Sequence, residues 1–130
     1  ASGIPMDWSG SEQWKWFDDE SDLSEFPTGR SGSWSGTEYF YEYCNKNTGK
    51  GIVAETDGNI FSAQPGDVIQ YVVDGWAHHS VIVTKVIYDD DGNVVDLLIN
   101  SNTTDRVDYP MSAYGYTDIR LIKIIGYNDK

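Results

Sequence analysis

The sequence predicts an α+β domain, with helices and loops first and an antiparallel sheet of at least four strands after them. A difference in residue pattern between two parts of the chain carries this prediction. Residues 1–50 are rich in Trp, Ser, Gly and Asp and show little alternation, whereas residues 51–127 contain β-branched runs separated by turn residues. The chain has no internal repeat and no low-complexity linker, so residues 1–130 are interpreted as a single domain.

One helix is well signalled in the first part. Ser35 stands three residues before Glu38, which is the capping-box spacing, so a helix is expected to begin near Ser35. Phe40, Tyr43 and Cys44 then share one apolar face. Cys44 lies near the negative end of this helix, where the helix dipole does not favour a thiolate, so we expect a buried core residue rather than a nucleophile.

The second part predicts the strands and their turns. "TDGN" is expected to join the first two strands in a hairpin, and "DDDG" to join two later ones. A calcium loop is the other interpretation of "DDDGNVVD", but its acid spacing and glycine position do not fit an EF-hand. The expected strands are "GIVAE", "NIFSA", a run from Asp67 to Val73, "HSVIVTKVIY", "NVVDLLINSN" and "RLIKIIGY".

The only two histidines, His78 and His79, stand at the mouth of one of these strands. Directly opposed residues of an antiparallel pair face the same side of the sheet. A four-residue loop over 89–92 would set His79 opposite Asn102, with Asn100 on the same face, whereas an odd-length loop would bring Ser101 round instead. A histidine beside an amide suits a general base for a cysteine nucleophile, and it equally suits a structural histidine.

Composition excludes several classes of partner. Twenty-one acidic and nine basic residues give a net charge of −12, which would repel nucleic acid and anionic lipid. No apolar stretch approaches the ~20 residues of a membrane helix. The single cysteine excludes an intrachain disulfide and a CxxC metal site. Low cysteine content, acidity and many aromatic residues suit a secreted bacterial domain.

The start of the chain resembles the end of a helix. In "ASGIP", Gly3 is followed two positions later by Pro5, which is a helix-stop pattern. Such a stop requires a helix before Ala1, and the other interpretation is a frayed terminus or an expression scar. The pattern by itself leaves both interpretations open.

Longer motifs resemble the bacterial putative amidase domain family, which belongs with papain-like cell-wall peptidases of the CHAP and NlpC types. The segment 66–71, "GDVIQY", and the segment 79–84, "HSVIVT", match the family's pattern. Thr103, Asp105 and Arg106 match the flanks of its "HTxDR" motif, and "SGSWSGTEYFYEY" and "ASGIPM" are similar to two further segments. The resemblance implies a papain-like or CHAP-like fold.

The resemblance also implies the site and its chemistry. His79 would be the general base and Asn102 its orienting partner, with Asn100 as second choice. The chain departs from the family where a longer acidic loop is reduced to Asp74, where His78 replaces an aspartate, and where Asn102 replaces a histidine. In the family the nucleophilic cysteine lies on the helix that ends at the segment matching residues 1–6. The resemblance therefore implies that this chain holds the base without its nucleophile, and without the helix that covers one face of the sheet.

The function implied is cysteine-dependent hydrolysis of a peptide or amide bond in peptidoglycan by a secreted or envelope-associated bacterial protein, with no metal or organic cofactor. The full-length protein would be the enzyme, and the chain as given would be inactive and prone to oligomerise through its uncovered sheet. A non-catalytic wall-binding or carbohydrate-binding module is the competing hypothesis, with a groove lined by Trp8, Trp14, Trp16 and Trp34.

Overall fold

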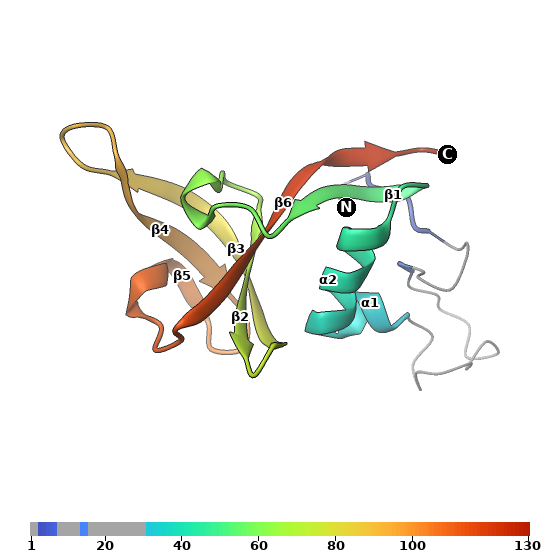
Figure 1. Ribbon diagram of the computed structural model, residues 1–130, viewed down its shortest axis with the longest axis horizontal. Coiled ribbons are helices and arrows are strands. Elements are labelled where there is room, and N and C mark those ends of the chain that lie inside the picture. Colours follow the sequence, from blue (N-terminus) through green and yellow to red (C-terminus); the bar gives the residue numbers. More distant parts are fainter. Residues whose placement is uncertain (1–2, 8–13, 16–30) are drawn as a thin grey trace. The chain divides into compact units, whose positions relative to one another are not determined.

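The α+β class is confirmed by a computed structural model, which describes residues 3–7, 14–15 and 31–130 (Figure 1). Within these residues the strands form one antiparallel six-stranded sheet in the order β1-β6-β2-β3-β4-β5. The elements are α1 (Gly32–Ser35), α2 (Thr37–Lys46), β1 (Gly51–Thr56), η1 (Ile60–Ser62), β2 (Val68–Val73), β3 (Trp76–Tyr88), β4 (Val94–Ser101), β5 (Arg106–Pro110), η2 (Met111–Ala113) and β6 (Asp118–Asn128), where η marks a 3-10 helix.

The chain divides into two compact units. The first unit is Ala1–Glu55 with Ile125–Lys130, and the second is Thr56–Ile124. Strand β6 belongs to both, because its last residues lie in the first unit. None of the helices in the described ranges has the length and apolar character needed to cross a bilayer.

Helix α2 presents the apolar face that the sequence predicts. Tyr43 and Cys44 are 0% and 2% exposed, while Phe40 is half-buried. The predicted capping box is wrong, because Gly36 is the N-cap of α2 and no side chain caps it. Ser35 ends the separate turn α1 and donates its hydroxyl to the Ser31 carbonyl oxygen, so that hydroxyl is already engaged.

The buried hydroxyl of Tyr43 connects three segments of the first unit. It lies 3.4 Å from Asp7 Oδ2 and 3.2 Å from the Lys50 carbonyl oxygen, to either of which it can donate. Gly51 follows with a φ of +103°, and a Cβ at this position would overlap the Tyr43 hydroxyl. Glycine is therefore required here both by backbone conformation and by the close approach of the phenol.

The hairpin between β2 and β3 follows from its turn sequence. Asp74 and Gly75 have φ values of +51° and +76°, and Val73 pairs directly with Trp76. Two consecutive positive φ values define the two-residue type I′ loop for which Asp-Gly is a preferred sequence. The expected strand from Asp67 to Val73 is confirmed as β2, one residue shorter.

The predicted strand "NIFSA" is wrong, because these residues form the short helix η1. Asn59 Oδ1 accepts the Phe61 backbone N–H, and the Ser62 hydroxyl donates to the Asn59 carbonyl oxygen. Such local side-chain bonds compete with pairing in a sheet, so "TDGN" leads into a turn of helix instead of a hairpin. Strand β5, in contrast, was not predicted.

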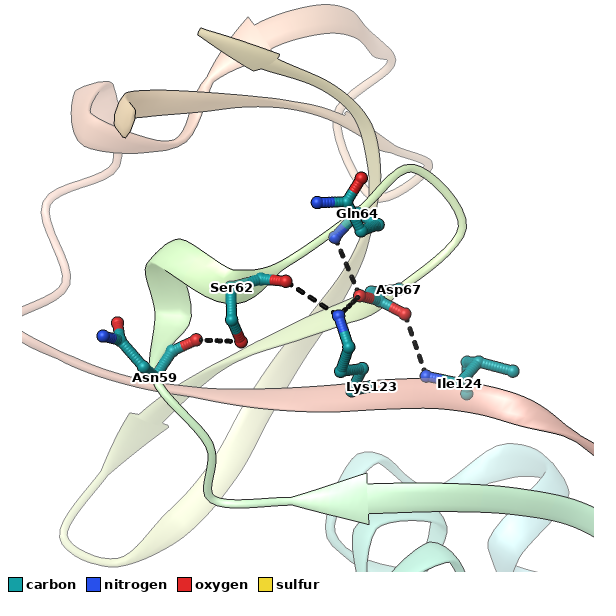
Figure 2. A network of polar contacts seen from close by, with 6 residues as sticks. All are labelled: Asn59, Ser62, Gln64, Asp67, Lys123 and Ile124. Atoms are coloured by element: carbon teal, nitrogen blue, oxygen red, sulfur yellow. Dashed lines mark hydrogen bonds and ion pairs between the residues drawn. The ribbon is translucent and has the colours of Figure 1, made fainter. Parts of the chain in front are cut away.

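A buried carboxylate fastens η1 to the sheet, as Figure 2 shows. Asp67 accepts the backbone N–H groups of Ile124 (2.9 Å) and Gln64 (2.8 Å). Lys123 Nζ lies 3.5 Å from Asp67 Oδ2 and donates to the Ser62 carbonyl oxygen at 2.7 Å. A buried carboxylate with this many partners is satisfied, so we assign the network a structural role.

The core of the second unit lies on one face of strands β2, β3, β4 and β6. Its members alternate along each strand, as the two-residue period requires. Partly buried residues from η1, β5 and the segment around η2 pack against the same face. The fully buried members are Ala63, Ile69, Tyr71, Val81, Val83, Leu97, Ile99 and Leu121.

Candidate functional site

The loop between β3 and β4 decides which residues meet at the open end of this hairpin. Tyr88 pairs with Val94, so the loop has five residues instead of the predicted four. Asp89 Oδ1 accepts the backbone N–H groups of Asp91 and Asn93, which closes the longer turn. Two bulges interrupt the pairing: Thr84 is an extra residue in β3, and Val95 is an extra residue in β4. Because one extra residue lies in each strand, the two shifts of the register cancel.

This register corrects the predicted partner of His79. Asn100 pairs with Ile82, on the face opposite to the core, and its Oδ1 accepts the backbone N–H of Asp108 at 2.9 Å. Asn102 is exposed in the turn after β4. His79 Nε2 instead lies 2.9 Å from Ser101 Oγ, and no hydrogen bond between described residues joins His79 to the expected Asn102 or Asn100. The odd-length loop is the physical reason, because a shift of one residue exchanges the two faces.

His79, and not His78, faces the aromatic residues of the core. Tyr71 pairs with His79 and Val72 pairs with Ala77, which leaves His78 as the extra, exposed residue of a bulge. Bulges often re-aim a side chain next to a functional site. The other ring nitrogen of His79, Nδ1, lies 3.5 Å from Thr103 Oγ1, at the edge of hydrogen-bonding distance.

Tyrosine rings surround His79 on the core side. The Tyr71 ring stacks on Tyr114 and Tyr116, with centroids 4.6 and 4.8 Å apart, and lies 6.1 Å from the His79 ring. Tyr109 meets Tyr114 edge-on at 5.5 Å. We call the whole group the His79 cluster; its members are Tyr71, His79, Ser101, Thr103, Arg106, Tyr109, Tyr114 and Tyr116.

Arg106 forms the far side of the His79 cluster. It pairs with Ser101 in the β4–β5 register, so strands β3, β4 and β5 contribute His79, Ser101 and Arg106 side by side. The guanidinium carbon of Arg106 lies 4.0 Å from the centroid of the Tyr109 ring and 5.6 Å from that of Tyr114. These are cation–π distances, so the two rings hold the charged group in place.

Desolvation sets the protonation states in and around the cluster. It lowers the pKa of His79 below its usual value of 6.5, so the imidazole is neutral at pH 7 and able to accept a proton. Burial, followed by the neighbouring Tyr114 and Asp96, raises the pKa of Tyr71 well above its usual range. Tyr71 is 1% exposed, and its hydroxyl has no hydrogen-bond partner within the part of the chain that the structure describes.

The sequence missed most of this arrangement. Ser101 entered only as the outcome of an odd-length loop, and Arg106 only as part of a matched motif. Tyr71 and Tyr114 carried no signal of their own, since tyrosines in strands are ordinary core residues. Gly92, whose φ is +82°, lies in both the expected and the observed loop, so the sequence carried no signal that separated the two lengths.

The remaining candidate groups lie outside the cluster. In residues 3–7, 14–15 and 31–130, no group of three His, Cys, Asp or Glu side chains is placed to hold a metal ion. The rings of Trp14 and Trp34 lie 4.6 Å apart, and Trp8 and Trp16 fall outside the described residues. A cavity of about 340 Å³ near the β2–β3 turn is lined by Asp57, Gly58, Val72, Gly75, Asp118, Ile119 and Arg120.

Cys44 is placed as the sequence predicts, buried within the first unit. Burial raises the pKa of its thiol to about 12, so the thiolate is scarce at neutral pH.

Comparison with known proteins agrees with the motifs around His79. No curated protein and no solved structure matches the chain. A family model described as putative amidase domain matches residues 1–125, which is nearly the whole length and includes every member of the His79 cluster. The chain therefore belongs to the putative amidase domain family.

Proposed function

We propose that this protein is an amide hydrolase in which His79 is the general base for a cysteine nucleophile. Membership of the putative amidase domain family supports hydrolysis of an amide. The contact between His79 Nε2 and Ser101 Oγ, 2.9 Å long, is the observation that carries the role of His79. A base needs a fixed ring and a free, basic nitrogen, and one fixed nitrogen leaves the other for the reaction.

Ser101 is the positioning residue in this proposal, in place of the expected Asn102 or Asn100. When the neutral ring donates its Nε2–H to Ser101 Oγ, the lone pair lies on Nδ1, whose neighbour Thr103 is exposed. Nδ1 is then the nitrogen that faces the reaction. The Tyr71 and Tyr114 rings, each 6.1 Å from the imidazole, restrict its rotation.

The reaction follows from these roles. His79 Nδ1 takes the proton of the cysteine thiol as the sulfur attacks the carbonyl carbon of the amide. The C–N bond then breaks, and the imidazolium returns this proton to the leaving amine. In the second half, water attacks the thioester while His79 accepts a proton from it, and the thiol and a carboxylic acid are released. These reaction steps require no metal or organic cofactor.

Cys44 does not fit the nucleophile, because it is 2% exposed and the pKa of its thiol is raised to about 12. In the family pattern the nucleophilic cysteine lies on a helix that ends at the segment matching residues 1–6. The φ of +78° at Gly3 suits the residue that follows a helix. We therefore propose a papain-like fold in the natural protein, with its nucleophile on polypeptide that precedes Ala1.

The substrate class and location remain those of the family resemblance. We propose a peptide or amide bond of peptidoglycan, and a secreted or envelope-associated bacterial protein. A second candidate, a carbohydrate-binding module without catalysis, is favoured by Tyr116, which is 39% exposed and stacks beside the cluster. Exposed aromatic rings of this kind present flat faces to a ligand.

Activity of the natural full-length protein tests the proposal, with release of new amino groups from peptidoglycan as the readout. The His79→Ala variant should lose 10²-fold to 10⁴-fold in rate, the usual contribution of a general base. The His78→Ala variant is the matched control and should keep its activity, because His78 is exposed in the bulge. The rate should rise with pH through the pKa of His79, since only the neutral imidazole accepts a proton.

Two outcomes would contradict this function. Equal activity of the His79→Ala and His78→Ala variants would remove His79 as the base. Binding of peptidoglycan by the wild-type protein without release of any amino group would favour the carbohydrate-binding module instead.

A further inference from the structure

Arg106 is held by cation–π contacts and has no ion pair with an acidic side chain of the described residues. The guanidinium lies over the Tyr109 ring, with the carbon 4.0 Å from the centroid. A cation–π contact uses none of the five N–H donors of the guanidinium as an ordinary hydrogen bond to oxygen, so the planar fork of donors remains able to bind a ligand. The same planar fork matches the two oxygens of a carboxylate.

No acidic side chain of the described residues fills this role. Neither the ion pair of Lys46 with Glu42 nor that of Lys123 with Asp67 involves Arg106. Asp108, a close neighbour of Arg106 in the sequence, instead accepts the Thr84 hydroxyl at 2.7 Å. In a chain with 21 acidic and nine basic residues, a half-buried arginine outside every such pair stands apart from the general charge pattern.

The position of Arg106 relates it to the candidate base. Ser101 pairs with Arg106 on one side and contacts the His79 ring on the other. Neighbouring strands are about 4.8 Å apart, so the backbones of β3 and β5 are separated by roughly 10 Å at this end of the sheet. Both side chains lie near the Tyr114 ring, whose centroid is 6.1 Å from that of the His79 ring and 5.6 Å from the guanidinium carbon of Arg106. A ligand of the size of one or two amino acids is long enough to touch both.

We propose that Arg106 is a specificity-determining residue that binds a carboxylate of the substrate, placed within one or two residues of the amide at His79. The substrate class is thus an acylated amino acid or short peptide with a free carboxylate close to the bond that is cut. That this ligand is a substrate rests on the function proposed above. The binding of such a carboxylate beside His79 does not, because it requires neither the nucleophile nor the reaction.

Two small probes separate this role from a purely structural cation–π contact. N-acetylalanine carries an amide and an adjacent carboxylate, and N-acetylalanine methylamide replaces that carboxylate by a neutral amide. Each is titrated into the chain of residues 1–130, with binding followed by the NMR signals of the His79 ring and the Arg106 Nε–H group. We expect the wild-type protein to bind N-acetylalanine about tenfold more tightly, which is typical of a charge-assisted hydrogen-bonded pair.

Three variants sharpen the test. Arg106→Gln should bind both probes equally weakly, while Arg106→Lys should keep part of the preference because it keeps the charge without the fork. Lys85→Gln makes the same change of charge at an exposed residue of β3 and should bind as the wild-type protein does. If Arg106→Gln fails to fold, the preference of the wild-type protein and its reduction in Arg106→Lys still decide the question.

Equal affinity of the wild-type protein for the two probes, or no binding of either, would overturn the proposal. So would a preference that survives in Arg106→Gln. These failures are distinct from failure of the proposed function. A natural protein that hydrolyses amides without regard to the neighbouring carboxylate refutes only the role of Arg106, whereas a preserved carboxylate preference with full activity of His79→Ala refutes only the role of His79.

Discussion

Each of the two compact units buries one large tyrosine, and the two hydroxyl groups are treated differently. Tyr43 in the first unit and Tyr71 in the second are 0% and 1% exposed, and burial is the main cause that raises both pKa values. The Tyr43 hydroxyl reaches Asp7 and Lys50. The Tyr71 hydroxyl has no partner among the described residues. Buried polar groups are normally satisfied, so an exception requires an explanation.

Burial also has opposite effects on Cys44 and His79, the two side chains considered as catalytic groups. Cys44 is sealed in the first unit, and burial raises the pKa of its thiol to about 12. His79 is half-buried at the end of the sheet, and desolvation lowers the pKa of its imidazole. Burial thus removes the reactive form of the cysteine while it favours the reactive form of the histidine. The first unit thus gives its buried tyrosine hydroxyl a partner, whereas the second leaves the Tyr71 hydroxyl without one among the described residues and favours the neutral form of His79.

The largest expected effect concerns the reactivity of Cys44. A pKa of about 12, compared with about 8.5 for a free thiol, reduces the thiolate by about three orders of magnitude at neutral pH. Labelling of the folded protein with a thiol reagent should be at least that much slower than labelling of the same protein in urea. Fast labelling of the folded protein would make Cys44 a reactive thiol and end the contrast with His79.

Glycine replacements probe the packing around the satisfied tyrosine. Gly51→Ala combines a φ of +103° with an overlap on the Tyr43 hydroxyl, and should reduce the free energy of unfolding by about 3 kcal/mol. Gly92→Ala is the matched control, since its φ is +82° but nothing lies within 4 Å of the added Cβ, and it should cost about 1 kcal/mol. Urea denaturation measures both. Equal losses would mean that the close approach to Tyr43 contributes nothing.

Removal of the two hydroxyl groups gives the smallest effects and tests the comparison directly. Tyr43→Phe should destabilise the protein by about 1 to 2 kcal/mol, because a buried hydrogen bond to the Asp7 carboxylate is lost. Tyr71→Phe should be neutral or stabilise it by up to about 1 kcal/mol, because the hydroxyl that it removes has no partner in the described part of the chain. Both changes are read from urea denaturation. A destabilised Tyr71→Phe would show that its hydroxyl is bound after all.

Sequence patterns are sufficient to predict those elements whose conformation depends on residues close together in the chain. The apolar spacing of Tyr43 and Cys44 determined the buried face of α2, and Asp74-Gly75 determines a type I′ hairpin because both residues tolerate a positive φ. The strands were predicted from alternation, with the exception of β5, whose five residues are too short to show a clear period. "NIFSA" failed because the Asn59 side chain stabilises a helical turn that competes with a strand.

The hydrogen-bond partner of His79 could not be predicted from the residues close to it in the chain. The sequence by itself determined that His79 lies in a strand, although β3 begins three residues earlier at Trp76, and that an asparagine or Ser101 meets it across a hairpin. Only the tertiary structure decided for Ser101, because the choice depends on the length of the β3–β4 turn and on whether the bulges in the two strands cancel. It also decided the place of Arg106 over Tyr109, since β5 is positioned by pairing with β4. Because successive side chains of a strand point to opposite faces of the sheet, a shift of one residue in the register moves every side chain to the other face. The strand propensity of individual residues does not indicate such a shift.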